Sequence, residues 1–139
     1  MLSGTLSYIF NEFSTVNGAV KPFSSVVKIA KEQGYTEPHP ADDLSGADVA
    51  RKLTILSRLI PELAQKLPEG YKSVSITSLV PTALQDNLGA SGDEFVQRLA
   101  NFDNEYESLR SGAVKDGNVL RYVGVINVAA GVVRAALEP

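Results

Sequence analysis

Acidic and basic side chains gather in residues 34–52, GYTEPHPADDLSGADVARK, around a short loop bracketed by prolines. The charged residues are Glu37, Asp42, Asp43, Asp48, Arg51 and Lys52. A protonated lysine can stabilise an oxyanion that develops on a carbonyl, or donate a proton to it. A carboxylate such as Glu37 can receive an ammonium group, and the flanking prolines would hold it still. The segment therefore predicts a pocket for a small zwitterionic substrate.

The same spacing also fits a helix start with no catalytic role. Ser45 is a good N-cap, and Asp48 three residues later completes a variant of the capping box. Leu44 and Val49 occupy the positions of a hydrophobic staple. Asp48 and Lys52 are four residues apart, which is the spacing of an ordinary ion pair on a helix surface. Spacing alone favours this second interpretation, and both remain open at this point.

Elements predicted in the first half of the chain would position these residues. Apolar residues at helical spacing predict a helix over residues 4–13. Pro22 opens a second helix, because its missing N–H is tolerated in the first turn, and Gly34 suits the position that ends it. A third helix is expected from near Ser45 to about Leu59, followed by a short helical turn over residues 61–67.

The second half reads as mixed structure. Alternating β-branched residues predict a strand over residues 72–80, and residues 86–92 read as a loop. A long charged helix is expected over residues 93–114, with one apolar side formed by Phe95, Leu99, Phe102, Tyr106 and Leu109. Residues 119–128 predict a strand, and a turn at 129–131 leads into a second strand over 132–137. The expected class is α+β, with helices packed on a mixed or antiparallel sheet.

Composition sets limits on function. A chain of 139 residues forms one domain with a real core. A net charge of −3 gives no electrostatic reason to expect nucleic acid or an anionic membrane as a partner. The chain has no cysteine and one histidine, His39, which we expect to be a solvated loop residue. The adjacent Asp42 and Asp43 are too few oxygen ligands to assign a metal, and no apolar run approaches a membrane span.

Three long motifs resemble a known family. They are GTLSYIFNEF, FSSVVKIAKEQGYTEPHPADDLSGADVARKLTIL and VLRYVGVINV. Together they resemble the substrate-binding and catalytic domain of homoserine dehydrogenase, most closely the fungal type. The resemblance implies a cytoplasmic, homodimeric enzyme that interconverts L-homoserine and L-aspartate 4-semialdehyde with NAD(P), on the route to threonine and methionine. It also implies a sheet that is used for dimerisation.

The resemblance assigns binding roles to residues of the first two motifs. Gly4 and Thr5 would line the substrate site. Tyr35 and Glu37 would contact the amino-acid end of the substrate, and Asp43 would support the polar network around it.

The resemblance assigns the catalytic roles to two residues of the third predicted helix. Asp48 would hold the reacting oxygen, and Lys52 would act as general acid or stabilise the new alkoxide while nicotinamide delivers hydride to the aldehyde carbon. Taken with the family pattern, the helix start and the site become one structure.

Two departures from the family pattern restrict this expectation. The chain has no G-x-G-x-x-G motif after a strand, so we expect no dinucleotide-binding domain in it. It also lacks the family's later strands, so residues 1–139 are expected to be a partial substrate-binding domain that is inactive alone. The alternative is a non-catalytic amino-acid-binding or dimerisation module derived from that fold.

Overall fold

The structure of the protein is a computed structural model that describes residues 3–17, 21–61, 75–85, 89 and 91–139. Its helical elements, in chain order, are α1 (Gly4–Phe13), α2 (Phe23–Glu32), α3 (Ala41–Leu44), α4 (Ala47–Arg58), α6 (Thr82–Gln85), α7 (Gly92–Leu99), the 3-10 turn η2 (Ala100–Phe102) and α8 (Asp103–Lys115). The strands are β1 (Ser75–Ile76), β2 (Arg121–Asn127) and β3 (Val132–Glu138).

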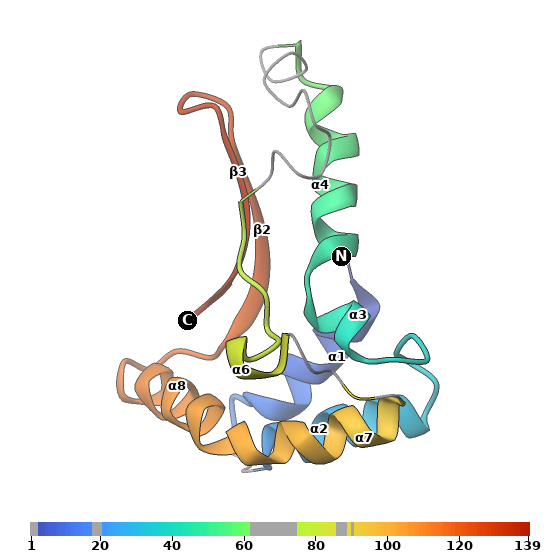
Figure 1. The fold of residues 1–139 in the computed structure, drawn as a ribbon. Coiled ribbons are helices and arrows are strands. Elements are labelled where there is room, and N and C mark those ends of the chain that lie inside the picture. Colours follow the sequence, from blue (N-terminus) through green and yellow to red (C-terminus); the bar gives the residue numbers. More distant parts are fainter. Residues whose placement is uncertain (1–2, 18–20, 62–74, 86–88, 90) are drawn as a thin grey trace.

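The three strands form a small mixed sheet in the order β1-β3-β2. β2 and β3 are an antiparallel hairpin, and β1 adds to β3 in parallel. The long helix α4 runs along one face of this sheet (Figure 1). Leu53 of α4 lies directly beside Gly124 of β2, where the absence of a side chain lets helix and strand approach closely.

The other helices gather at one end of the sheet, where α1, α2, α7 and α8 pack together (Figure 1). Their apolar stripes meet in a core that includes the fully buried rings of Phe10, Phe13, Phe23 and Phe95. Arg121, the first residue of β2, ties the sheet to this group. Its guanidinium donates hydrogen bonds to the carbonyls of Phe10, at 3.0 Å, and Ser14, at 2.7 Å. The start of β2 is therefore fixed to the end of α1.

The predicted α+β class is confirmed, as are the first two helices and the hairpin. Gly34 has φ +78° and ends α2 as predicted. The N–H of Tyr35 bonds to the carbonyl of Ala30, and the N–H of Gly34 bonds to that of Lys31, which is the Schellman pattern. This turn directs the chain back toward the start of α1.

The third predicted helix, from near Ser45 to about Leu59, is confirmed as α4, and a short helix that the sequence did not predict, α3, precedes it. The predicted strand 72–80 is paired only at Ser75–Ile76 within its described part, and residues 72–74 lie outside the described residues. Most of the helical turn expected at 61–67 also lies outside them.

The predicted helix 93–114 is interrupted by the 3-10 turn η2. This turn changes the phase of the buried stripe, because a 3-10 turn holds three residues and an α-turn holds 3.6. Leu109, expected inside, is therefore 51% exposed, while Arg110 and Ala113 are buried. In the described part of the chain, no helix is long and apolar enough to cross a membrane.

Candidate active site

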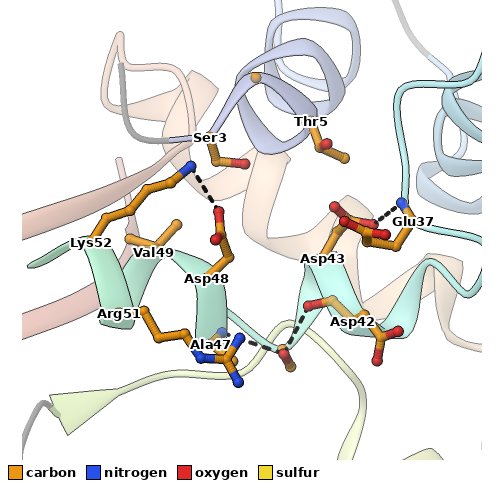
Figure 2. Close-up of a pocket in the computed structure, with 12 residues that line it drawn as sticks. Ser3, Thr5, Glu37, Asp42, Asp43, Ala47, Asp48, Val49, Arg51 and Lys52 are labelled. Carbon is orange, nitrogen blue, oxygen red and sulfur yellow. Dashed lines mark hydrogen bonds and ion pairs between the residues drawn. The ribbon is translucent and has the colours of Figure 1, made fainter. Parts of the chain in front are cut away.

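A polar cavity of about 630 Å³ opens between the start of α1 and the junction of α3 with α4. Its lining consists of Ser3, Gly4, Thr5, Glu37, Asp42, Asp43, Ser45, Ala47, Asp48, Val49, Arg51 and Lys52 (Figure 2). Of the seven site residues expected from the sequence, only Tyr35 is not in this lining. The structure therefore brings together residues from α1, from the loop after α2, and from α3 and α4.

The N-terminus of α1 forms one wall of the cavity. Ser3 caps this helix, since its hydroxyl oxygen accepts a hydrogen bond of 3.1 Å from the N–H of Leu6. Gly4 and Thr5 follow in the first turn, where backbone N–H groups have no partner within the helix. Such a helix start attracts negative charge, because the N–H groups and the helix dipole point the same way.

The loop that carries Glu37 packs against α7. Lys31, at the end of α2, makes an ion pair of 3.0 Å with Asp93 in the first turn of α7. The His39 ring packs against Phe95, with ring centroids 5.1 Å apart, and Pro40 is fully buried. The loop is thus supported by core side chains.

Glu37 and Asp43 are joined across this loop. The backbone N–H of Glu37 donates to Oδ2 of Asp43 at 2.8 Å (Figure 2). Burial raises the pKa of the Asp43 carboxyl above its ordinary value, and the nearby charges of Glu37 and Asp42 act in the same direction. The Glu37 N–H and the Thr5 side chain oppose this rise. Asp43 thereby fixes the place of Glu37 in the cavity.

Asp48 and Lys52 form an ion pair on the first two turns of α4. Nζ of Lys52 lies 2.9 Å from Oδ2 of Asp48, and both side chains are about half exposed, at 47% and 58% (Figure 2). The i,i+4 spacing read from the sequence is confirmed. The pair faces Ser3 and Thr5 of α1 across the cavity, so a cation and a carboxylate are available to one small molecule.

Arg51 lies on a different side of α4. Figure 2 shows its side chain extending toward Ala47, away from the Lys52–Asp48 pair. The side chains of Arg51 and Lys52 therefore lie at different parts of the cavity lining.

The predicted capping box at Ser45 is wrong. Ser45 has helical angles, φ −65° and ψ −22°, and is the C-cap of α3. The N-cap of α4 is Gly46, at φ 79°, and it makes no side-chain cap. The Ser45 hydroxyl instead donates to the carbonyl of Asp42 at 3.0 Å and accepts from the N–H of Ala47 at 3.3 Å. The spacing of Ser45 and Asp48 did not reveal this, because the sequence did not predict that a separate helix, α3, ends directly before α4.

Tyr35 lies outside the cavity lining, whereas His39 lies in other surroundings than predicted. Tyr35 is 51% exposed, and its ring packs against Tyr8 with centroids 4.8 Å apart. Its carbonyl accepts a hydrogen bond from the Thr5 hydroxyl, so it supports the cavity from outside. His39 is not a solvated loop residue: its Nδ1 accepts from the N–H of Ala41 at 3.3 Å, and its Nε2 is buried.

Ser3 was missed by the sequence reasoning, although a signal was present. Ser3 directly precedes the helix predicted over residues 4–13, and serine is a typical N-cap residue. Because the adjacent residues of α1 reach the cavity, that cap also places a hydroxyl at its edge.

Cofactor and metal chemistry can be tested against these residues. Dinucleotide binding requires parallel strands with helical crossovers and a glycine-rich turn at a helix start. The sequence contains no such glycine motif, and the described sheet has a single short parallel pairing. The residues present therefore do not fit a dinucleotide. In the described part of the chain, no group of three or more histidine, aspartate or glutamate side chains could hold a metal.

Fold and site together define an α+β domain with a polar cavity that offers two opposed pairs of charged groups. The model of the family "Homoserine dehydrogenase" matches residues 1–139. The chain therefore belongs to the homoserine dehydrogenase family.

Curated and solved proteins support the same assignment. Homoserine dehydrogenase of Schizosaccharomyces pombe is 50% identical over 93% of this chain and 33% of its own length. The enzyme of Saccharomyces cerevisiae is 44% identical over 99% of the chain and 37% of its own length. A crystal structure of a Candida auris protein described as of unknown function superposes with a TM-score of 0.88 at 41% identity, covering 99% of this chain and 37% of that one. The chain thus spans about a third of the length of these relatives.

Proposed function

We propose that this chain supplies the substrate site of a homoserine dehydrogenase, which interconverts L-homoserine and L-aspartate 4-semialdehyde with NAD(P). The observation that carries the proposal is the cavity in which Glu37 and Asp43 lie on one side and Asp48 with Lys52 on another. The substrate is a small amino acid with a reacting oxygen at the far end of its side chain. Its charged groups and its reacting oxygen need different partners, and the cavity offers both.

The amino-acid end of the substrate is bound by the loop and by α1. The carboxylate of Glu37 receives the substrate ammonium, and Asp43 holds the backbone of Glu37 in place. The substrate carboxylate lies at the start of α1, where the N–H groups of Gly4 and Thr5 favour negative charge. Tyr35 contributes through its carbonyl, which holds the Thr5 hydroxyl.

The reacting oxygen is bound by Asp48 and Lys52. When the aldehyde becomes an alcohol, negative charge develops on its oxygen, and the ammonium of Lys52 stabilises that charge or donates the proton. Asp48 accepts a hydrogen bond from the hydroxyl of homoserine. In the free protein, the Lys52 ammonium is paired with the Asp48 carboxylate.

The remainder of the enzyme lies outside this proposal. We propose that residues 1–139 form part of one substrate-binding domain and that another part of the complete enzyme binds NAD(P). We expect this chain alone to show no NAD(P)H oxidation with aspartate semialdehyde. Clear turnover by the pure chain would contradict this division of roles.

Calorimetry with L-homoserine tests the site. We expect binding that is lost in Lys52→Ala and in Glu37→Gln. Lys28→Ala is a matched control, because Lys28 and Glu32 form another exposed i,i+4 pair on α2, outside the cavity. A wild-type chain that ignores homoserine, or variants that bind it normally, would refute the proposed site.

A second candidate function is a dimerisation module that keeps the fold but binds no substrate. It is favoured by the face of the β2–β3 hairpin opposite α4, along which no described helix lies (Figure 1). A chain that sediments as a dimer but gives no heat with homoserine would support this candidate over the first.

A further inference from the structure

The start of α4 rests on the hydroxyl of Tyr122, which projects from β2. Gly46 is the N-cap of α4 and has φ 79°, a backbone conformation that favours glycine. A Cβ at this position would collide with Oη of Tyr122 and would lie 2.9 Å from Cγ2 of Ile76. The backbone of Gly46 therefore packs directly against the sheet.

Tyr122 is itself fixed. Its hydroxyl donates a hydrogen bond of 2.9 Å to the carbonyl of Thr77, which follows β1. Thr77 is held by its own N–H, which donates to the carbonyl of Ala135 in β3 at 2.8 Å. Burial raises the pKa of Tyr122 to about 12, so the hydroxyl keeps its proton into the alkaline range.

A second hydrogen bond joins the end of α3 to the segment that follows β1. The N–H of Leu79 donates to the carbonyl of Leu44, the last residue of α3, at 2.8 Å. The turn between α3 and α4 is thus held by this bond on one side and by Tyr122 on the other. Asp48 is two residues beyond Gly46, and Lys52 follows one helical turn later.

From this arrangement we infer that Tyr122 is a positioning residue for the Asp48–Lys52 pair, acting through its contact with Gly46. The inference rests on the proposed function of that pair. Tyr122 is not among the residues that line the cavity. It sets the height of the first turn of α4 above the sheet, and with it the distance of Asp48 and Lys52 from Thr5 and Glu37. Sites that are loose by about 1 Å lose much of their activity, so a small shift here matters.

The test removes only the hydroxyl, in Tyr122→Phe, and measures two quantities on the complete chain. The first is L-homoserine affinity by calorimetry. The second is the set of NMR signals of Asp48 Cγ and Lys52 Nζ, which report the ion pair without any ligand. We expect affinity to fall by roughly three- to tenfold, as a misplaced binding group predicts, and both signals to move.

Ser24→Ala is the control. The Ser24 hydroxyl also donates a structural hydrogen bond, to the Asp103 carboxylate at 2.6 Å, but Ser24 belongs to α2 and does not line the cavity. A hydroxyl with a purely structural role should lower stability and leave the affinity and both signals unchanged. If Tyr122→Phe behaves in this way, the inference is overturned.

A double variant gives an independent measurement. Gly46→Ala should weaken binding more than Tyr122→Phe, because the new methyl group meets the hydroxyl. Adding Tyr122→Phe to Gly46→Ala should recover part of the lost affinity, and strictly additive losses would contradict the contact. If the wild-type chain does not bind homoserine, the proposed function fails, and the signals of Asp48 and Lys52 in Tyr122→Phe then decide the positioning role alone.

Discussion

Asp43 is the carboxyl of the cavity whose pKa is raised, with burial as the main cause. A raised pKa means that the folded protein binds more protons than the unfolded chain just above the ordinary value of 3.8. The free energy of unfolding therefore falls as pH rises through this range, because its slope follows the excess of protons on the unfolded state. Asp43 contributes most to stability when protonated and loses this contribution toward neutral pH.

Asp43→Asn should consequently gain stability relative to the wild type as pH rises from 4 to 7. The amide oxygen can still accept the N–H of Glu37, and the ionisation is gone. Urea unfolding of both proteins at each pH measures the difference. Asp116→Asn, at the end of α8, is the control for replacing an acid by an amide away from the cavity. A difference for Asp43→Asn that does not change with pH would contradict the raised pKa of this carboxyl.

Lys52 should be nearly dispensable for folding although binding depends on it. Its pair with Asp48 is half exposed, and exposed i,i+4 pairs contribute about 0.3–0.5 kcal/mol. We expect Lys52→Met to change the free energy of unfolding by less than about 0.5 kcal/mol and to abolish homoserine binding. Urea unfolding and calorimetry on the same preparation separate the two effects. A loss of several kcal/mol would instead mark Lys52 as a structural residue.

At the residue scale, the sequence predicts local relationships well. The spacing of Asp48 and Lys52 on one helix face follows from helical periodicity, and the prolines around Glu37 indicate a held loop. The Asp43–Glu37 bond and the contact of Gly46 with Tyr122 could not be predicted. Each depends on where the chain turns or where a distant strand returns, and no local pattern encodes that.

At the scale of the elements, helix α2 receives its N-terminal cap from a residue of another helix, α8. It begins after Pro22 and makes no side-chain cap of its own. The carboxylate of Asp103, the first residue of α8, accepts the N–H of Ser24 at 2.8 Å and its hydroxyl at 2.6 Å. The 3-10 turn η2 ends at the residue before Asp103. Apolar periodicity predicted one long helix over residues 93–114, because it carries no information about a carboxylate that caps another helix.

Asp103→Ala should therefore destabilise the protein by about 1–2 kcal/mol, the usual cost of losing a helix N-cap. Glu105→Ala is the matched control, since it removes an exposed acid from the same first turn of α8. We expect its effect to stay within about 0.5 kcal/mol. Thermal or urea unfolding compares the two variants. Equal losses of stability in the two variants would mean that the negative charge at the start of α8 stabilises the protein, rather than the contact of Asp103 with Ser24.

At the scale of the whole molecule, the hairpin is covered on one face and open on the other. Val125 pairs with Arg134 across the hairpin, one residue out of step with Gly124, so its side chain lies on the face opposite α4. Alternation along the strands could predict that one face is buried. It could not show which helix covers it, because the direction of α4 along the sheet depends on the turn at Gly46.

We expect this open face to join two copies of the chain, as the resemblance of the sequence to its family implies. A sheet that exposes apolar residues and an edge strand invites pairing. Val125→Asp would place a charge at the centre of that contact and should convert a dimer to a monomer in sedimentation experiments. Val114→Asp on α8 is the control, because Val114 is a 58% exposed apolar residue away from the sheet. A wild-type chain that sediments as a monomer would show that there is no such contact. A dimer that persists in Val125→Asp but is lost in Val114→Asp would show that the contact lies on α8.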